Sequence, residues 1–263
     1  ITNPYFAELA LGIDDIASMY KYNIILANSD YDNDKILKVV RNLHAKQVDG
    51  IVFMGFDLSP ELRAEFKSSS TPVVVAGSVV NDKELPAVRI DYRKAAKEAV
   101  TRLLDHNHDQ VALVTGSLGY SINADDRLSG YKDALADAGV DFDDQLVIET
   151  DGSYKQIYDQ AKAIADSGVK AAYVTNDHLA VGLLNGLTDS GIKVPDDFEI
   201  ISSNDTTYTR LCRPMLTSIS QPLYDIGAVS MRLLTKLMED KDDSESDVIL
   251  EHSIIPRQST RLQ

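Results

Sequence analysis

The sequence predicts an α/β protein built from two doubly wound, parallel-sheet lobes with a ligand cleft between them. The chain of 263 residues is long enough for two lobes of roughly 120 residues each. Short runs rich in β-branched residues alternate with longer amphipathic segments, which is typical of βαβ units. This alternation occurs twice along the chain, and ligands of such sheets bind at the carboxyl ends of the strands.

The first lobe begins with a predicted helix over residues 5–20. Phe6, Leu9 and Ile13 recur every three or four residues and so form one apolar stripe. Asn3 can cap this helix, and Pro4 suits its first position. The remaining predicted elements of this lobe are a strand at 22–27, a helix at 32–46, a strand at 50–54, a helix at 60–69 and strands at 72–76 and 88–90.

The second lobe repeats the pattern, and two of its predicted helices end at Gly139 and Gly191, a residue type common at helix ends. The acidic stretch at 240–247, near the end of the chain, is interpreted as a solvated connector or as a binding tail. The predicted elements are helices at 93–106, 123–139, 154–167, 177–191 and 222–239 and strands at 111–115, 146–150, 171–175, 198–202, 248–250 and 253–255.

The composition argues against nucleic-acid binding by this stretch alone. Its net charge is −15, from 41 acidic and 26 basic residues, whereas a phosphate backbone binds concentrated positive charge. The single cysteine, Cys212, excludes an internal disulfide, and a reducing cytoplasm is the simplest setting. No apolar run approaches the ~20 residues of a membrane span. The chain starts at Ile1 with neither a signal peptide nor an initiator Met, so we expect that a signal peptide or a whole domain has been removed upstream.

The search for catalytic motifs returns little. The five histidines are scattered, and none belongs to an HExxH motif or a ligand-spaced cluster. The turn at 116–119 matches no nucleotide-binding loop, so it is either a plain turn or the rim of a ligand pocket. No GxSxG elbow is present, and Cys212 fits packing better than nucleophilic attack. We predict a binding protein without enzymatic activity, cofactor or metal ion.

Six short motifs are spread over the whole chain: NPYF at 3–6, DY at 91–92, DDRLSGYKDAL at 125–135, TND at 175–177, VPDD at 194–197 and RPMLTSISQP at 213–222. In order and spacing they resemble the core of the LacI/GalR family of transcription regulators. The resemblance implies a periplasmic-binding-protein-like type I fold and a homodimer. The helix-turn-helix domain that binds the DNA operator in this family is absent from these residues.

The chain of such a core crosses between its lobes more than once. The resemblance therefore implies an N-terminal lobe of 1–90 with 222–247 and a C-terminal lobe of 91–221 with 248–263.

The resemblance also implies which residues line the effector cleft. Aromatic side chains can pack against a sugar, an Arg can bind phosphate with two hydrogen bonds, and an Asp accepts from hydroxyls. Arg127 has an alternative role, pairing with Asp125 or Asp126 at a helix start. Position 204, where the family usually has Asp, is Asn here, which leaves the effector open. The predicted effector-binding residues are Tyr5, Phe6, Asp91, Arg127, Tyr173 and Asn204.

Three segments, at 13–30, 46–54 and 221–236, are similar to regulators of carbon catabolite control, which bind the phosphocarrier protein HPr phosphorylated on a serine. Asp225, Val229, Arg232 and Lys236 share one face of the last helix, and Arg232 suits a phosphoserine. The alternative is a solvated face with salt bridges. The partner-binding residues implied are Asp14, Asp15, Met19, Tyr20, Tyr224, Asp225, Val229, Arg232, Thr235 and Lys236.

We therefore expect the effector-binding and dimerising core of a carbon catabolite regulator, switched by serine-phosphorylated HPr and by sugar phosphates. A sugar-binding protein of a transport system has the same expected fold and is the alternative. An enzyme would need a catalytic constellation that the sequence does not contain.

Overall fold

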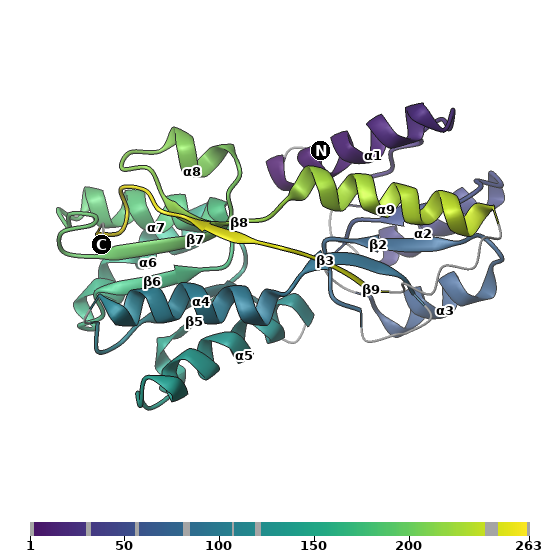
Figure 1. Ribbon diagram of the computed structural model, residues 1–263. Helices are drawn as coiled ribbons and strands as arrows, with labels where there is room; N and C mark the ends of the chain where they lie inside the picture. The colour runs from purple at the N-terminus through teal and green to yellow at the C-terminus, as the bar shows by residue number, and fades with distance from the viewer. Residues whose placement is uncertain are drawn as a thin grey trace. The chain divides into compact units, whose positions relative to one another are not determined.

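The computed structural model describes residues 3–29, 33–55, 58–80, 85–106, 108–118, 122–239 and 247–261. The chain divides into two compact units (Figure 1): unit 1 comprises Ile1–Ile90 and Pro222–Leu250, and unit 2 comprises Asp91–Gln221 and Glu251–Gln263. The last crossing falls after 250, not after 247 as the sequence suggested, because the strand before it pairs within unit 1. The acidic stretch at 240–247 lies outside the described residues, apart from Asp247.

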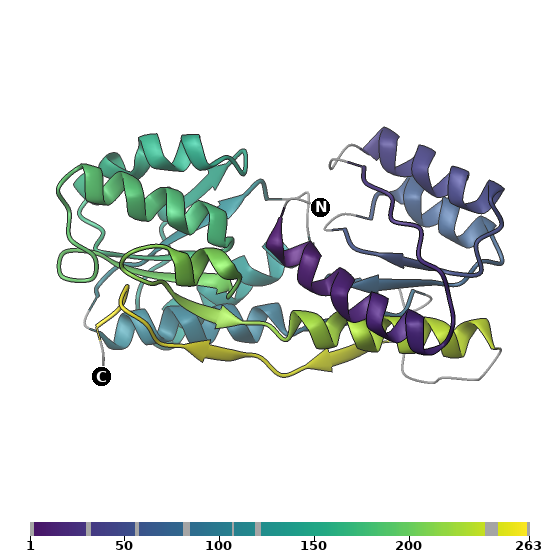
Figure 2. The ribbon, with the colours of Figure 1, turned by 90° about the horizontal axis from the view of Figure 1, so that it is seen from above.

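A parallel four-stranded sheet forms the centre of unit 1, in the order β1-β2-β3-β9. Its strands are β1 (Ile51–Phe53), β2 (Val73–Ala76), β3 (Ala87–Ile90) and β9 (Asp247–Leu250). All four residues of β2 are buried, which explains its unbroken apolar run. The helices of this unit are α1 (Pro4–Met19), α2 (Asn33–Ala45), α3 (Pro60–Ser68) and α9 (Leu223–Met238). Helix α1 lies across α9 in both views (Figures 1 and 2).

The predicted strand at 22–27 is not a strand in the structure. Residues 22–28 have no strand assignment, and Ile24, Ile25 and Leu26 are 43%, 56% and 58% exposed. Together with side chains from α2 and β1, this segment lines a cavity of about 430 Å³. The apolar, β-branched composition favours a strand, but strand formation also needs a paired neighbour. Among the described strands, β1 pairs only with β2.

Unit 2 contains a six-stranded sheet in the order β10-β8-β7-β6-β4-β5. The edge strand β10 runs antiparallel to β8, and the other pairs are parallel. Strand β8 was not predicted, because its TSIS sequence is polar, although it is largely buried. The strands are β4 (Ala112–Gly116), β5 (Val147–Thr150), β6 (Ala171–Val174), β7 (Glu199–Asn204), β8 (Thr217–Ser220) and β10 (Ser253–Ile255).

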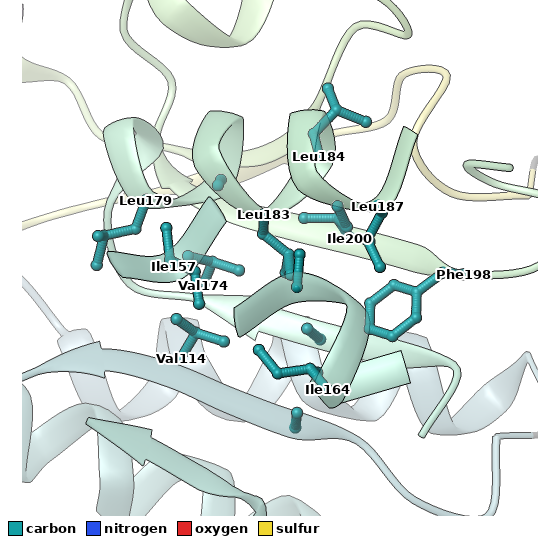
Figure 3. Packing of buried hydrophobic residues seen from close by; sticks show 14 of the residues in the cluster. Val114, Ile157, Ile164, Val174, Leu179, Leu183, Leu184, Leu187, Phe198 and Ile200 are labelled. Atoms are coloured by element: carbon teal, nitrogen blue, oxygen red, sulfur yellow. The ribbon is translucent and has the colours of Figure 1, made fainter. Parts of the chain in front are cut away.

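The helices of unit 2 pack in pairs, α4 with α5 and α6 with α7. Ile157, Leu183 and Phe198 are almost fully buried between α6, α7 and the sheet (Figure 3). No helix within the described ranges is long and apolar enough to cross a membrane. The helical elements are α4 (Tyr92–Asp105), α5 (Ile122–Asp137), η1 (Asp144–Leu146), α6 (Tyr154–Asp166), α7 (Asp177–Asp189) and α8 (Thr207–Leu211).

Candidate functional site

A series of side-chain contacts at the carboxyl edge of the unit 2 sheet joins several predicted effector-binding residues. Strands β4, β6, β7 and β8 are parallel neighbours, so their carboxyl ends lie on one edge. Arg127 comes from α5, Tyr173 from β6 and Asn204 from the end of β7. Side chains at this edge are in the position where open α/β sheets bind ligands.

Arg127 lies against an aromatic ring that the sequence analysis did not single out. Its guanidinium carbon is 4.5 Å from the centroid of the Tyr92 ring, within the range of a cation–π interaction. The Nε atom is buried and has no hydrogen-bond partner among the described residues. Among the ion pairs seen between described residues, none joins Arg127 to Asp125 or Asp126, so the alternative role as a helix-start partner is not observed there. Arg127 is thus held between the Tyr92 ring and Tyr173, whose pKa it lowers in part.

Tyr173 is fully buried in β6, and its hydroxyl makes no well-formed hydrogen bond within the described ranges, although the side chains of Ser203 and Arg127 lie close to it. Burial raises the pKa of Tyr173, and the nearby positive charge of Arg127 opposes that shift. The hydroxyl therefore stays protonated and can donate. A buried polar group without a partner is costly, so we expect this hydroxyl to bond to a ligand or a water molecule.

Asn204 ends β7 in a backbone conformation that few residue types adopt. Its φ is 142° and that of Asp205 is 55°, and Asn and Asp tolerate positive φ better than most residues. The Oδ1 atom of Asn204 accepts a 2.6 Å hydrogen bond from Nε2 of Gln221. Asp205 is held separately by a 2.6 Å ion pair with Arg257. The Asn204 side chain is thus fixed at the edge of the sheet.

Asp91 caps helix α4. Its Oδ1 accepts a 2.9 Å hydrogen bond from the backbone nitrogen of Lys94, which satisfies one of the free amides at the helix start. This role follows from local geometry, and it leaves one carboxylate oxygen for other contacts.

Tyr5 and Phe6 lie near the start of α1 and belong to unit 1. Their rings meet edge to face, with centroids 5.1 Å apart. The hydroxyl of Tyr5 donates a 3.1 Å hydrogen bond to the carbonyl of Gly77. Gly77 has a φ of +78°, and a Cβ there would lie 2.3 Å from the Tyr5 hydroxyl, so glycine is needed for this contact. The Tyr5 ring is only 4% exposed, whereas Phe6 is half-buried.

Tyr92 and Gln221 are site residues that sequence reasoning missed. Tyr92 is 1% exposed, and its Oη lies 3.3 Å from Oε1 of Gln221. Tyr92 thereby links Arg127 to Gln221, which in turn holds Asn204. Both residues lie inside motifs that carried the family resemblance. Their meeting could not be read from those motifs, because 129 positions separate them in the sequence.

Neither a metal centre nor an activated thiol is found in the part of the chain that the structure describes. No group of three or more His, Cys, Asp or Glu side chains there could hold a metal ion. Burial raises the pKa of Cys212, and its Sγ lies 3.4 Å from the Thr209 carbonyl and 3.3 Å from the Pro214 carbonyl. Cys212 therefore has the environment of a packing residue.

The residues predicted to bind a partner lie on two helices of unit 1 that touch at their backbones. A Cβ at Gly12 would lie 2.0 Å from the carbonyl oxygen of Tyr224, and one at Gly227 would lie 2.1 Å from that of Leu9. Only glycine at both positions permits this distance. The register of α1 against α9 is therefore set by two glycines, and we call the exposed side chains of these two packed helices the α1/α9 face.

Most of the predicted partner residues are exposed on this face. Val229 is half-buried, and Thr235 is buried, with its Oγ1 donating to the Met231 carbonyl at 2.9 Å. Thr235 thus packs inside unit 1 and does not reach the α1/α9 face, because it lies one position before the exposed stripe. The exposed predicted residues are Asp14, Asp15, Met19, Tyr20, Tyr224, Asp225, Arg232 and Lys236.

The charges of the α1/α9 face are unevenly paired. The Tyr224 hydroxyl donates a 2.8 Å hydrogen bond to Oδ2 of Asp15, which raises the pKa of Tyr224. The charge of Arg232 is close enough to lower that pKa in part. Arg232 itself is exposed and makes no ion pair with any residue in the described ranges. An exposed, unpaired guanidinium beside a tyrosine is suited to a phosphate group.

Comparison with known proteins identifies the family. Residues 1–257 match the family model described as periplasmic binding proteins and sugar binding domain of LacI family. The chain belongs to the LacI family. A solved relative is described as a transcription regulator, and both the predicted fold class and the predicted family are confirmed.

Several relatives are similar over nearly the whole chain. Catabolite control protein A of Streptococcus mutans is 52% identical over 99% of this chain and 78% of its own length, and that of Priestia megaterium is 44% identical over 99% and 79%. The crystal structure of CcpA of Lactococcus lactis has a TM-score of 0.95 and 47% identity, covering 99% of this chain and 96% of that one. A LacI family regulator of Enterococcus faecium solved with bound ribose has a TM-score of 0.85 and 28% identity, covering 99% and 95%. These likenesses support a role in transcription regulation of catabolite control.

Proposed function

We propose that this chain is the effector-binding and dimerising core of a carbon catabolite regulator, switched when serine-phosphorylated HPr docks on the α1/α9 face. The observation that carries the proposal is Arg232, an exposed guanidinium without an ion pair in the described ranges. Lys236 lies one helical turn further along α9, on the same side. Both residues give this part of α9 positive charge that suits a phosphoserine, and Asp14 and Asp225 are exposed acidic residues of the same two helices that suit a basic partner.

The switch needs two states of the regulator that differ in their affinity for the partner. Binding of the phosphorylated partner can shift the equilibrium only by the difference between its affinities for the two states. In the proposed mechanism the core is a cytoplasmic homodimer, and the shift changes how it presents DNA-binding domains that lie outside these residues.

A small effector at the carboxyl edge of unit 2 would tune the same equilibrium. Arg127 offers charge, and Tyr173 offers a buried hydroxyl donor. A sugar phosphate fits this pair, because its phosphate satisfies the donors and its ring packs on aromatic side chains. The relative that binds ribose supports a sugar moiety.

Calorimetric titration with HPr, with and without its serine phosphate, tests the docking proposal. We expect binding of the phosphorylated form alone, weakened at least about thirtyfold by Arg232→Ala, because loss of one partner of a charge-assisted pair costs about 2–5 kcal/mol. Arg41→Ala is the matched control: Arg41 is an exposed arginine of unit 1 on α2, paired with Glu65 at 2.9 Å. Equal binding of both forms of HPr, or equal loss in both variants, contradicts the proposal.

A further inference from the structure

We infer that Gln221 selects the ligand class of the unit 2 edge by orienting the side-chain amide of Asn204, so that this edge presents hydrogen-bond donors to an anionic, acceptor-rich group such as a phosphate. The inference rests on the proposed effector site and adds to it a residue that determines specificity. Gln221 is not itself required to touch the ligand.

The amide of Gln221 is held at both ends. Its Oε1 faces the hydroxyl of Tyr92 at 3.3 Å, and its Nε2 faces Oδ1 of Asn204 at 2.6 Å. Gln221 is 5% exposed and Tyr92 is 1% exposed, so neither group can exchange its partner for bulk water. With Tyr92 donating to Oε1, Gln221 donates through Nε2, and the acceptor atom of Asn204 is occupied.

Asn204 then has only its donor group, the Nδ2 amide, left for a ligand. Its Nδ2 makes no hydrogen bond with a described residue, whereas its Oδ1 is bound to Gln221. An amide has one acceptor and one donor end, so fixing one end determines what the other offers. The backbone at the end of β7, where Asn204 has a positive φ, is held in place by the ion pair between Asp205 and Arg257.

The neighbouring groups at this edge are donors as well. The Arg127 guanidinium carries donors and no acceptor, and its buried Nε is unpartnered within the described ranges. The Tyr173 hydroxyl is fully buried and makes no well-formed hydrogen bond within the described ranges, with Ser203 and Arg127 beside it. The buried carboxylate nearby, Asp177, is already occupied by the hydroxyls of Ser202 and Thr206 and by the Thr206 backbone nitrogen. Its oxygens are therefore not offered to a ligand.

The balance between hydrogen-bond donors and acceptors at this edge decides which ligand fits. A phosphate oxygen only accepts, so it suits an edge that offers donors, and the positive charge of Arg127 strengthens such bonds. A sugar hydroxyl also has a proton to donate, and Asn204, Arg127 and Tyr173 offer it only donors, which leaves the second carboxylate oxygen of Asp91 as its acceptor among the predicted effector-binding residues. Leaving a buried polar group unpaired is penalised far more than a mere loss of contact. The edge as built therefore prefers the anion.

The test reverses the orientation of the Asn204 side-chain amide without substituting any residue that faces the ligand. In Gln221→Glu the carboxylate only accepts, so Asn204 must turn its Nδ2 toward residue 221 and present Oδ1 to the ligand, whereas Tyr92 still donates as before. Gln221→Met removes the restraint without adding charge. Gln258→Glu is the control for charge, since Gln258 lies elsewhere in unit 2 and uses its Oε1 to accept from the Met215 nitrogen at 3.0 Å. The probes are inorganic phosphate, ribose 5-phosphate and ribose, titrated by calorimetry.

For the unaltered protein we expect ribose 5-phosphate to bind about tenfold or more tightly than ribose. Gln221→Glu should lower that preference by about tenfold and Gln221→Met by a few-fold, with Gln258→Glu unchanged. A preference that stays within about twofold in both Gln221 variants overturns the inference and leaves the effector site intact. If the unaltered protein binds ribose and neither phosphate compound, the donor edge is refuted. If it binds none of the three probes, the proposed effector site itself fails, and this inference fails with it.

Discussion

Each unit has its own largely parallel sheet packed with helices, but the two units use different contacts to attach their elements to one another. In unit 2 the terminal segment of the chain is attached to the sheet by buried charged and polar groups. In unit 1 two helices meet through backbone contact at glycines, and an apolar segment stays exposed beside a cavity. The terminal segment of unit 2 is thus held by electrostatic pairing and the α1–α9 pair of unit 1 by shape, and the two kinds of restraint respond to different perturbations.

The attachment in unit 2 centres on Glu199, which begins β7 and is fully buried. Its oxygens lie 2.7 Å from Nδ1 of His106 and 3.0 Å from Nε2 of His108, and they accept from Nε and the backbone nitrogen of Arg261 at 2.5 and 3.0 Å. Burial alone would raise the pKa of Glu199, but hydrogen bonds from His108, His106 and Arg261 outweigh it and lower the pKa to about 2. The carboxylate therefore stays charged.

The largest effect is expected from Glu199→Gln. The change removes the charge that four donors surround, and breaking a buried pair by removing one partner costs about 3 kcal/mol or more. Hydrogen exchange should accelerate in β10 and in residues 257–261, with little change in unit 1. Glu98→Gln is the control, because Glu98 pairs with His252 at 2.9 Å but is 45% exposed, and such pairs contribute at most about 1 kcal/mol. Equal effects of the two variants would show that burial of the Glu199 pair does not matter, and equal acceleration of exchange in both units would contradict the contrast between the units.

The same carboxylate gives unit 2 a dependence on acid that Glu199→Gln should remove. Its pKa is depressed in the folded state, so its contribution to stability is complete above the unfolded-state pKa, about 4.3. That contribution is lost as the pH falls from there toward about 2. Urea unfolding followed by amide exchange between pH 6 and 3 measures it. Retention of the full acid dependence in the variant would assign it to other carboxylates.

A smaller but still large loss is expected in unit 1 from Gly227→Ala. The new Cβ would lie 2.1 Å from the Leu9 carbonyl, so α1 and α9 must move apart, at a cost of about 1–3 kcal/mol. Because the two helices carry the α1/α9 face, affinity for serine-phosphorylated HPr should fall together with the unfolding free energy. Gly116→Ala, where a Cβ meets nothing within 4 Å, should change neither quantity appreciably. Normal HPr binding by a destabilised Gly227→Ala protein would show that docking does not depend on helix register.

The smallest effect is expected from Ile25→Ser, which tests the exposed segment at residues 22–27 of unit 1. Ile25 is 56% exposed, so its replacement should change the unfolding free energy by less than about 1 kcal/mol. Val75→Ala, in the fully buried β2, should cost about 2 kcal/mol in the same chemical denaturation experiment. Equal losses would mean that residues 22–27 are buried as a strand, as their sequence predicts.

Much of the fold was predictable because local sequence signals indicate where its helices and strands lie. Helix α1 begins where Asn3 and Pro4 predict, with the Asn3 side chain accepting from the Tyr5 nitrogen, and the buried runs of β2, β4 and β6 are where apolar residues cluster. The errors in the predicted strands arise where pairing with a neighbouring strand, or the lack of it, outweighs the local amino-acid composition. The polar β8 is a strand because β7 and β10 flank it, and the apolar stretch at 22–27 is not one because it lacks such a pair.

The sequence by itself determined the family, the two-unit plan and the residue types of the candidate sites, because these depend on motifs and on local periodicity. Only the tertiary structure decided which of those residues can act. It buried Thr235, used Asp91 as a helix cap, and joined Tyr92 to Gln221. The physical reason is that burial and hydrogen-bond pairing depend on contacts between residues far apart in the chain. Those contacts have no signature in the spacing of either partner.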